Sequence, residues 1–478
     1  MIISELIKEK YIKMPNKEYI FEKKDGKFQG ITFKEFIEKT NYLARYLLDK
    51  NLKNKNILLI GKNSINYMIA DLAIVSYVGI VVNVNKDTKQ KELKEIIENI
   101  DISCIIYDEE QVEIINSIKQ DKNNLIYVSM KEYEYIFKEE QQRNEELFNF
   151  PVKDNNVCSK IVFSSGTTSD PKAIMLSLKN IFSGWESLQK RTKFYESDVI
   201  YLFLPLHHTY AGIYNFLYSL ISGLSIYLSS GIENIGKEIL EVNPTIFCSV
   251  PLIYRKIYEV AGDNLKYAFG KNIRFMYSGG SPFPKNIRKA YLDANLPLLE
   301  AYALTETASS FSIAYPNDVD IDSVGTIYED IDVIIKNANK NGIGEIAIKG
   351  DNVFLGYYHN DEATKKVFDE NNYFLTGDLG YIKNNKLYLT GRKKKVLISE
   401  NGENIYPEEI EKNLKKLNSN ITHVKVYLKN QKLCCSIYVS KKENLNELIN
   451  SYNKEATKKD IIKKYEVILD IPQNRLKG

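Results

Sequence analysis

A short segment from Ile161 to Lys172 has the residue types of a phosphate-binding loop. Three apolar residues are followed by Ser, Gly and Thr residues and then by the lysine. Small residues allow backbone N–H groups to point at an anion, hydroxyls add hydrogen-bond donors, and the lysine adds a positive charge. The segment lacks the G-x-x-x-x-G-K-[ST] order of a Walker loop. A Ser/Gly/Thr-rich stretch is also common in plain connections, so composition alone leaves both interpretations open.

Five motifs follow one another from this loop toward the C-terminus. They are 164–172 (S-S-G-T-T-S-D-P-K), 302–307 (Y-A-L-T-E-T), 344–358 (G-E-I-A-I-K-G, then G-Y-Y), 373–380 (Y-F-L-T-G-D-L-G) and 391–410 (G-R-K-K-K, then G-E-N-I-Y-P-E-E-I). In this order they resemble the signatures of the adenylate-forming superfamily, which contains acyl-CoA synthetases, firefly luciferase and peptide-synthetase adenylation domains. Each motif is moderately specific, and five in sequence leave little room for chance.

The resemblance implies an ATP site with Mg²⁺. Lys172 would neutralise the β- and γ-phosphates, which would be held by Ser164, Ser165, Gly166, Thr167 and Thr168. Thr305 would contact the α-phosphate, and Glu306 would bind Mg²⁺ as a hard oxygen ligand. Asp378 would accept hydrogen bonds from both ribose hydroxyls, with Arg392 as a second polar contact, and Tyr302 would stack on the adenine. The turn that contains Gly279, Gly280 and Ser281 would let the backbone approach the adenine or the acyl group. Without the resemblance, Glu306 would be read as solvated surface and Asp378 as a turn residue.

The same resemblance assigns roles outside the nucleotide. His208 would line the route between the acyl pocket and the adenylate, and Gly402 belongs to the segment that would serve the thiol step. Lys477 would be the catalytic lysine that touches the carboxylate and the α-phosphate. The chain ends in Lys-Gly where the family has Gly-Lys, so Lys477 lies one position early. A metal site at the His207-His208 pair is not favoured, because ligand spacing and a carboxylate cluster are missing.

The elements that must position these residues alternate in the first 150 residues. Helical spacing of apolar residues predicts helices over 33–48, 64–77 and 88–100, and short apolar runs predict strands over 57–60, 80–84 and 104–107. This βαβ rhythm predicts an α/β fold with parallel sheets covered by helices. The uncharged stretch 199–232 contains Pro, His and Gly residues, which favours a buried strand–helix–strand unit over a membrane span. The polar stretch 139–149 predicts a solvated connection.

A chain of 478 residues is too long for one ordinary core, which predicts at least two domains. After Gly391 the sequence becomes lysine-rich, with predicted strands at 424–428 and 433–439 and a predicted helix at 445–452. We therefore expect an N-terminal adenylation domain over residues 1–391 and a small, mobile α+β lid domain over residues 392–478. The resemblance adds a distorted β-barrel subdomain to the larger domain and a hinge near Lys394.

Bulk composition restricts the partners. The net charge is +3, from 65 basic and 62 acidic residues, and no basic patch is interleaved with aromatic residues, so nucleic acid is not expected. Five scattered cysteines without C-x-x-C spacing indicate a reducing, cytoplasmic setting. The N-terminus lacks a signal-peptide core, and no transmembrane segment is expected. A homo-oligomer is possible.

Together these features predict an acid–thiol ligase. A carboxylic acid, fatty or another simple acyl acid, would react with ATP to give acyl-AMP and pyrophosphate, and CoA would then accept the acyl group. No acidic residue lies near Leu204–Tyr210 to hold an amino group, which argues against an α-amino acid. Two alternatives stay open: loading of an aryl or acyl acid onto the phosphopantetheine of a carrier protein, and a nucleotide- or acyl-binding homologue with impaired adenylation. A hydrolase is disfavoured, because no G-x-S-x-G elbow is present.

Overall fold

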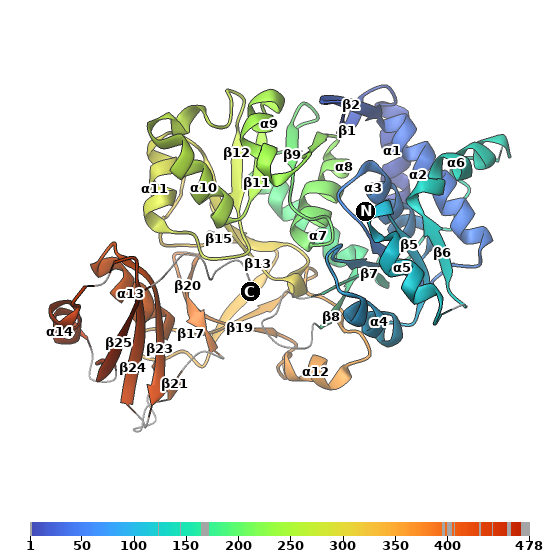
Figure 1. Cartoon of the computed structure of the whole chain (residues 1–478). Coiled ribbons are helices and arrows are strands. Elements are labelled where there is room, and N and C mark those ends of the chain that lie inside the picture. The colour runs from blue at the N-terminus through green and yellow to red at the C-terminus, as the bar shows by residue number, and fades with distance from the viewer. Residues whose placement is uncertain are drawn as a thin grey trace. The chain divides into compact units, whose positions relative to one another are not determined.

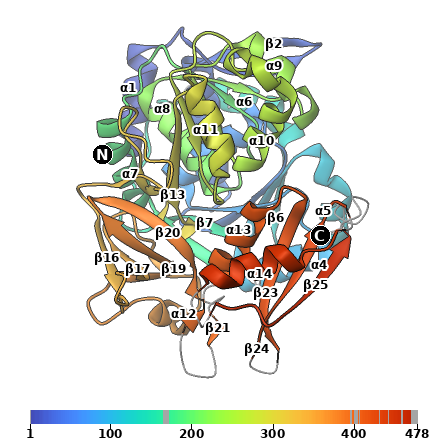
Figure 2. The ribbon, with the colours of Figure 1, turned by 90° about the vertical axis from the view of Figure 1, so that its left-hand side faces the viewer.

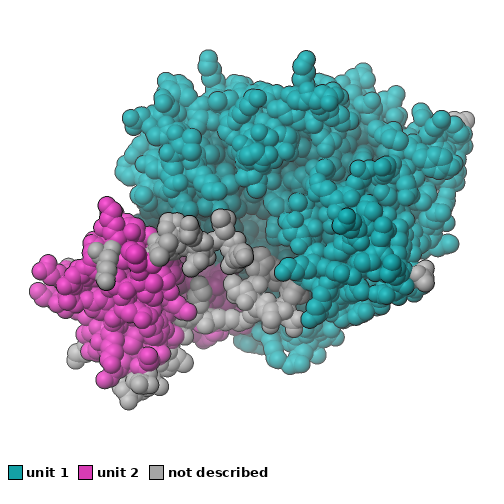
Figure 3. All heavy atoms as spheres, viewed as in Figure 1, with its two compact units in different colours: residues 1–332, 349–374 teal, residues 333–348, 375–478 magenta. Residues whose placement is uncertain are grey.

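A computed structural model describes residues 2–122, 124–143, 145–163, 172–393, 397–398, 404–405, 407–429, 432–441, 443–456 and 460–469. The chain forms two compact units, coloured separately in Figure 3. Unit 1 comprises residues 1–332 and 349–374, and unit 2 comprises residues 333–348 and 375–478. The domain boundary at residue 391 and the hinge at Lys394 stay predictions, and Lys394 lies outside the described residues.

Unit 1 contains a seven-stranded sheet with the order β18-β8-β7-β4-β3-β5-β6 (Figure 1). Strands β3 to β7 pair in parallel, whereas β7–β8 and β8–β18 are antiparallel. The strands are β3 (Asn56–Ile60), β4 (Ile80–Val84), β5 (Ile102–Tyr107), β6 (Ile126–Ser129), β7 (Cys158–Phe163), β8 (Ala173–Ser177) and β18 (Gly356–Tyr357). The antiparallel end therefore holds the strands on either side of the predicted phosphate loop.

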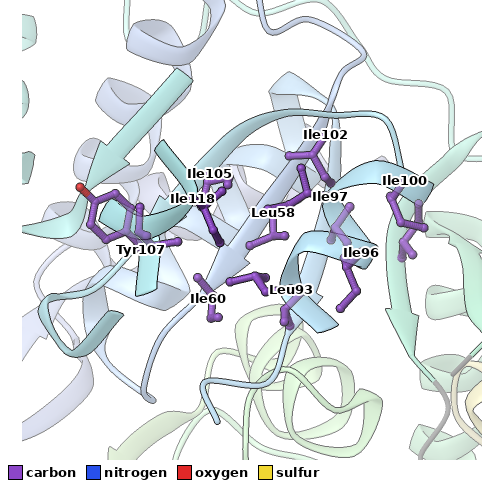
Figure 4. Packing of buried hydrophobic residues seen from close by; sticks show 14 residues of the cluster. Leu58, Ile60, Leu93, Ile96, Ile97, Ile100, Ile102, Ile105, Tyr107 and Ile118 are labelled. Atoms are coloured by element: carbon purple, nitrogen blue, oxygen red, sulfur yellow. The ribbon is translucent and has the colours of Figure 1, made fainter. Parts of the chain in front are cut away.

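The apolar core of this sheet forms where β3, β4 and β5 meet the helices α4 (Gln90–Asn99) and α5 (Val112–Lys119). Figure 4 shows Leu58 and Ile60 of β3 beside Leu93 of α4. Parallel strands covered on both faces are near-continuous apolar runs. That is why β3, β4 and β5 lie within two residues of their predicted positions.

A second sheet of unit 1 has the order β15-β14-β13-β12-β11-β9-β10-β1-β2. Its strands are β1 (Glu18–Lys24), β2 (Lys27–Thr32), β9 (Val199–Leu202), β10 (Ser225–Leu228), β11 (Ile246–Ser249), β12 (Phe275–Ser278), β13 (Leu298–Ala303), β14 (Ser310–Ile313) and β15 (Thr326–Ile327). Helices α9 (Ile235–Val242), α10 (Pro251–Ala261) and α11 (Lys285–Asp293) cover one face (Figure 1), and Tyr254 and Tyr291 fill the core beneath them.

The other helical elements of unit 1 lie around these two sheets. The α-helices are α1 (Ile3–Lys13), α2 (Phe33–Asp49), α3 (Ile65–Ala73), α6 (Tyr133–Gln142), α7 (Leu178–Arg191), α8 (Tyr218–Ser222) and α12 (Asp361–Lys366). The π-helical segments are η1 (Ile74–Val78) and η4 (Tyr210–Leu217), and the 3₁₀ segments are η2 (Glu109–Gln111), η3 (Met130–Glu132), η5 (Ile232–Asn234), η6 (Gly262–Tyr267) and η7 (Thr305–Thr307).

The helices and strands predicted for the first 150 residues are present in the structure. Helix α2 begins after a capping box in which Thr32 and Glu35 bond each other's backbone N–H groups, as its predicted start requires. The strand–helix–strand unit at 199–232 is confirmed by β9, η4 with α8, and β10. No helix in the described part of the chain is long and apolar enough to cross a membrane. The predicted connection at 139–149 is wrong at its start, because α6 buries Phe137 and Glu140 and continues to Gln142.

The described residues of unit 2 form strands and two α-helices. One group has the order β16-β17-β19-β20, a hairpin pairs β21 with β22, and a three-stranded sheet has the order β23-β24-β25. Helices α13 and α14 lie on one face of the three-stranded sheet (Figure 2) and contribute Leu414 and Ile449 to its core. The bounds are β16 (Asp332–Lys336), β17 (Gly344–Lys349), β19 (Phe374–Lys383), β20 (Lys386–Arg392), β21 (Leu397–Ile398), β22 (Asn404–Ile405), α13 (Pro407–Leu417), β23 (Ile421–Lys429), β24 (Lys432–Val439), α14 (Asn446–Glu455) and β25 (Lys464–Leu469). The α+β texture predicted for the C-terminal residues is confirmed, and the β-barrel subdomain stays a prediction.

Candidate active site

Lys172 is positioned by the pairing of β8 with β18. It directly precedes β8, and the backbone N–H of Tyr358 donates to the carbonyl of Ala173 at 2.9 Å. This register places Tyr357 opposite Ile174 and brings its ring under the lysine. The Lys172 Nζ lies 4.3 Å from the ring centroid of Tyr357. An ammonium over an aromatic face is attracted by the negative potential of the ring.

Glu306 reaches the same tyrosine from another part of the chain. It lies in η7, which follows β13, and its backbone carbonyl accepts a hydrogen bond from the N–H of Phe354 at 2.8 Å. The Tyr357 hydroxyl donates to Glu306 Oε1 at 3.1 Å. Lys172 and Glu306, predicted independently from two motifs, therefore converge on Tyr357.

The electrostatic surroundings keep Tyr357 protonated. Burial of the phenol raises its pKa well above the ordinary value for tyrosine, and the neighbouring Glu306 carboxylate raises the pKa further. The side chain is therefore a neutral hydrogen-bond donor to Glu306 at physiological pH. Tyr357 belongs to the G-Y-Y segment of the third motif, but the motif by itself does not predict its role.

The backbone around Glu306 has an unusual conformation. Ala308, directly after η7, has φ +54° and is buried. A residue with a β-carbon seldom adopts positive φ, and such positions persist where the surroundings determine them. Here the Oγ1 of Thr307 accepts a hydrogen bond from the N–H of Leu304, and the same hydroxyl donates to the carbonyl of Ser309 at 2.8 Å. These contacts fix the short turn that presents Thr305 and Glu306.

A second part of the predicted site lies at the carboxyl end of β12. Gly280 has φ +84°, a conformation that favours glycine, and Ser281 beside it is exposed. A β-carbon on Gly279 would lie 3.6 Å from the carbonyl oxygen of Ala301 and 3.9 Å from the ring of Tyr210. The turn therefore lies against β13, which carries Tyr302.

Two aromatic residues frame this turn. Tyr302 is buried, and its ring contacts Phe311 edge-on with the centroids 4.8 Å apart. The Tyr210 hydroxyl donates to the backbone carbonyl of Tyr277 at 2.9 Å. Tyr210 thus connects η4 to the end of β12, a link that sequence reasoning missed because it depends on tertiary packing.

The two consecutive histidines precede η4. Their ring centroids are 4.2 Å apart, and Asn63 fixes the preceding backbone by donating to the carbonyl of Leu204 and accepting from the N–H of Leu206. Burial, together with the neighbouring ring, lowers the pKa of His207 to about 3, and burial also lowers the pKa of His208. Both imidazoles are therefore neutral at physiological pH. The sequence alone gave no reason to assign a role to Asn63.

In unit 2 the two predicted ribose contacts lie side by side. Asp378 of β19 is the register partner of Arg392 of β20, and the Arg392 Nε lies 2.9 Å from Asp378 Oδ1. The Asp378 N–H donates to the Oγ1 of Thr376 at 3.0 Å, and that hydroxyl donates in turn to the carbonyl of Ile346. The carboxylate is nearly buried, whereas the guanidinium side chain is 62% exposed. The Asp378 carboxylate could accept hydrogen bonds from a polar ligand, and the Arg392 guanidinium could donate hydrogen bonds to it.

The donor set at Glu306 fits a magnesium ion. Mg²⁺ is typically bound by one or two carboxylates together with the phosphates of a substrate. Glu306 offers a half-buried carboxylate with one oxygen fixed by Tyr357, beside a lysine that would attract phosphate. Several predicted site residues lie outside the described residues and stay predictions: Ser164, Ser165, Gly166, Thr167, Thr168, Lys394, Gly402 and Lys477.

Known proteins resemble this chain in sequence and in fold. Residues 8–358 match the family model described as "AMP-binding enzyme". The long-chain-fatty-acid–CoA ligase ACSBG2 of Rattus norvegicus is 24% identical over 497 residues, covering 88% of this chain and 74% of the relative. The 2-succinylbenzoate–CoA ligase of Oceanobacillus iheyensis is 29% identical over 409 residues, covering 83% of this chain and 80% of the relative.

Two solved structures share the fold. ATP-bound MatB from Rhodopseudomonas palustris has a TM-score of 0.84 at 21% identity, covering 99% of this chain and 96% of that chain. MenE from Bacillus subtilis, in complex with ATP and magnesium, has a TM-score of 0.81 at 21% identity, covering 97% and 95%. The predicted α/β fold class is confirmed by these neighbours.

Proposed function

Because the chain belongs to the AMP-binding enzyme family, we propose that it joins a carboxylic acid to a pantetheine thiol in an ATP-dependent reaction. In the first step a carboxylate oxygen attacks the α-phosphorus of ATP, which releases pyrophosphate and gives acyl-AMP. In the second step the thiolate sulfur attacks the acyl carbon, which releases AMP and leaves a thioester. CoA is the proposed acceptor.

The observation that carries this proposal is the convergence of Lys172 and Glu306 on Tyr357. The first step brings two anions together, so fixed positive charge is the main requirement. Lys172 would neutralise the β- and γ-phosphates, Thr305 would contact the α-phosphate, and Glu306 would hold Mg²⁺. The metal, when bound, supplies further neutralisation of the phosphate charge.

The remaining assignments are proposals for residues of unit 2. Asp378, with Arg392 beside it, would bind the ribose hydroxyls. Lys477 would contact both the carboxylate and the α-phosphate during the first step. Rotation about Lys394 would then bring the segment around Gly402 to the adenylate for the thiol step.

The substrate is proposed to be a fatty or another simple acid. The relatives named above act on a long-chain fatty acid and on 2-succinylbenzoate. The described residues 204–210 contain no acidic side chain that could hold an amino group, and His207 and His208 are neutral. An aryl acid, a carrier protein as acceptor, or a homologue with impaired adenylation are the alternatives. A cytoplasmic location and a homo-oligomer are further proposals.

The test is ATP–pyrophosphate exchange with Mg²⁺ across fatty, short-chain, aryl and amino acids. Exchange with one class of acid supports adenylation and identifies that class. Lys172→Met and Glu306→Gln should each reduce exchange by about 10²–10³, the effect of removing one positioned charge from a phosphoryl-type transition state. CoA and a phosphopantetheinylated carrier protein are then compared as acceptors. If the wild-type chain binds ATP but shows no exchange with any acid, this result would favour the homologue with impaired adenylation.

A further inference from the structure

We propose that Tyr357 is a positioning residue that holds the metal-binding carboxylate and the phosphate-binding ammonium in one arrangement. This inference rests on the proposed function, because it takes Glu306 as the magnesium ligand and Lys172 as the phosphate cation. One side chain makes both contacts: its hydroxyl donates to Glu306 Oε1 at 3.1 Å, and its ring centroid lies 4.3 Å from Lys172 Nζ.

Tyr357 is itself held rigidly. Its backbone pairs with Ile174 of β8, and its N–H donates to the Oγ1 of Thr364 at 2.9 Å. Gly356 before it has φ +132°, and a β-carbon there would lie 2.9 Å from the Thr364 methyl group. The ring also contacts Phe354 edge-on, with the centroids 5.0 Å apart. Because the backbone and the ring of Tyr357 are both held in place, this residue can keep Glu306 and Lys172 in a fixed arrangement.

The two contacts have different consequences. The hydrogen bond to Oε1 restricts the orientation of the Glu306 carboxylate, which would hold the metal. The ring attracts the ammonium of Lys172 without carrying a net charge, so the lysine keeps its full positive charge for phosphate. A carboxylate in place of the ring would neutralise that charge. A tyrosine therefore satisfies both requirements with a single residue.

The neighbouring tyrosine provides a matched control. Side chains alternate across a strand, and Tyr358 packs partly against the core of the seven-stranded sheet. Its hydroxyl accepts a hydrogen bond from Asn56 Nδ2 at 3.0 Å and lies 3.2 Å from Asp101 Oδ2. Tyr358→Phe removes a hydroxyl from the same segment without touching Glu306 or Lys172.

The experiment compares Tyr357→Phe, Tyr357→Leu and Tyr358→Phe in the full chain. Mn²⁺ binding at saturating ATP is measured by electron paramagnetic resonance, and metal-free ATP binding by calorimetry in EDTA. Tyr357→Phe should weaken Mn²⁺ binding by about ten- to a hundred-fold, the effect of one hydrogen bond to a charged group. The affinity of this variant for metal-free ATP should stay within about twofold of the wild-type value, because the ring beside Lys172 remains.

Tyr357→Leu should weaken metal-free ATP binding as well, by about two- to five-fold, because the ring is lost. Tyr358→Phe should change neither affinity. In pyrophosphate exchange, Tyr357→Phe should raise the Mg²⁺ concentration for half-maximal rate and recover most of kcat at high Mg²⁺. If Tyr357→Leu does not fold, the Mn²⁺ affinity of Tyr357→Phe alone tests the positioning role.

Unchanged Mn²⁺ affinity in Tyr357→Phe, or equal losses in Tyr357→Phe and Tyr358→Phe, would overturn the positioning role while leaving the ligase proposal intact. A wild-type chain that binds neither ATP nor Mn²⁺ with ATP would overturn the proposed function itself. The two failures are therefore distinguishable.

Discussion

A buried ion pair between Lys160 of β7 and Asp71 of α3 leads to a quantitative prediction about stability. Lys160 Nζ donates to Asp71 Oδ1 at 2.6 Å and to Asn83 Oδ1 at 2.8 Å, and the two charged side chains are 1% and 2% exposed. Asn83 Nδ2 donates in turn to Asp71 Oδ1 and to the Tyr67 hydroxyl. Both charges have lost their water, so each depends on the other for compensation.

Removing one partner should therefore be far more costly than removing both. Lys160→Met leaves the Asp71 carboxylate buried without its cation, and breaking a buried pair in this way costs about 3–5 kcal/mol of unfolding free energy. In the double variant Lys160→Met/Asp71→Leu no charge is left buried at this site, and replacement of such a pair by apolar residues is often neutral. We expect the double variant to lie within about 1–2 kcal/mol of the wild type, because only the Asn83 amide loses partners.

The assay can follow this part of the molecule directly. Trp185, the single tryptophan of the chain, lies in α7 of unit 1, so its fluorescence reports unfolding of the unit that contains the ion pair. Guanidinium unfolding of the wild type, both single variants and the double variant gives the coupling energy from the midpoints and slopes. Two results would refute the reasoning: a Lys160→Met variant within 1 kcal/mol of the wild type, or a double variant less stable than both single variants.

Three further predictions concern catalysis and pH. Lys477→Ala should slow acyl-AMP formation by about 10²–10³ and leave thioester formation from supplied acyl-AMP largely intact; unchanged adenylation in single-turnover measurements would remove Lys477 from the mechanism. Asp378→Ala should raise the KM for ATP by about tenfold or more, because charged hydrogen bonds to the ribose are lost; an unchanged KM would contradict the ribose assignment. The pKa of His207 is lowered to about 3 in the folded chain, so below about pH 6.5 the unfolded chain binds more protons there, and stability falls as the pH decreases toward 3. His207→Asn should therefore lose less stability than the wild type between pH 7 and pH 5, as measured by chemical unfolding, and a parallel decline in both proteins would count against this linkage.

Much of the fold could be predicted because its signals are local. Continuous apolar runs mark the parallel strands, and the helical spacing from Phe33 marks α2 to within one residue. The motifs at 302–307 and 373–380 also pointed to Glu306 and Asp378, and in the structure each has a close polar partner. Their roles as a magnesium ligand and a ribose contact stay predictions.

The missing parts of the site depend on pairings between distant segments. Strand β18 has two residues, too few for any periodicity, and its pairing with β8 is what brings Tyr357 to Lys172. Tyr210 reaches the end of β12 through a tertiary hydrogen bond, and Asn63 holds a segment about 140 residues further along the chain. No local pattern of residue types records such contacts.

The large separation in sequence between β8 and its partner strand β18 has a consequence for biosynthesis. Strand β8 ends at Ser177, but the strand that covers its open edge is translated about 180 residues later. At about 5–20 residues per second, the ribosome leaves this edge unpaired for roughly 10–40 s. An unpaired edge next to apolar strands can associate with other chains. The nascent protein should therefore need protection, by a chaperone or by the ribosome itself, until Tyr357 has emerged, and shorter translation products that end before this residue should aggregate.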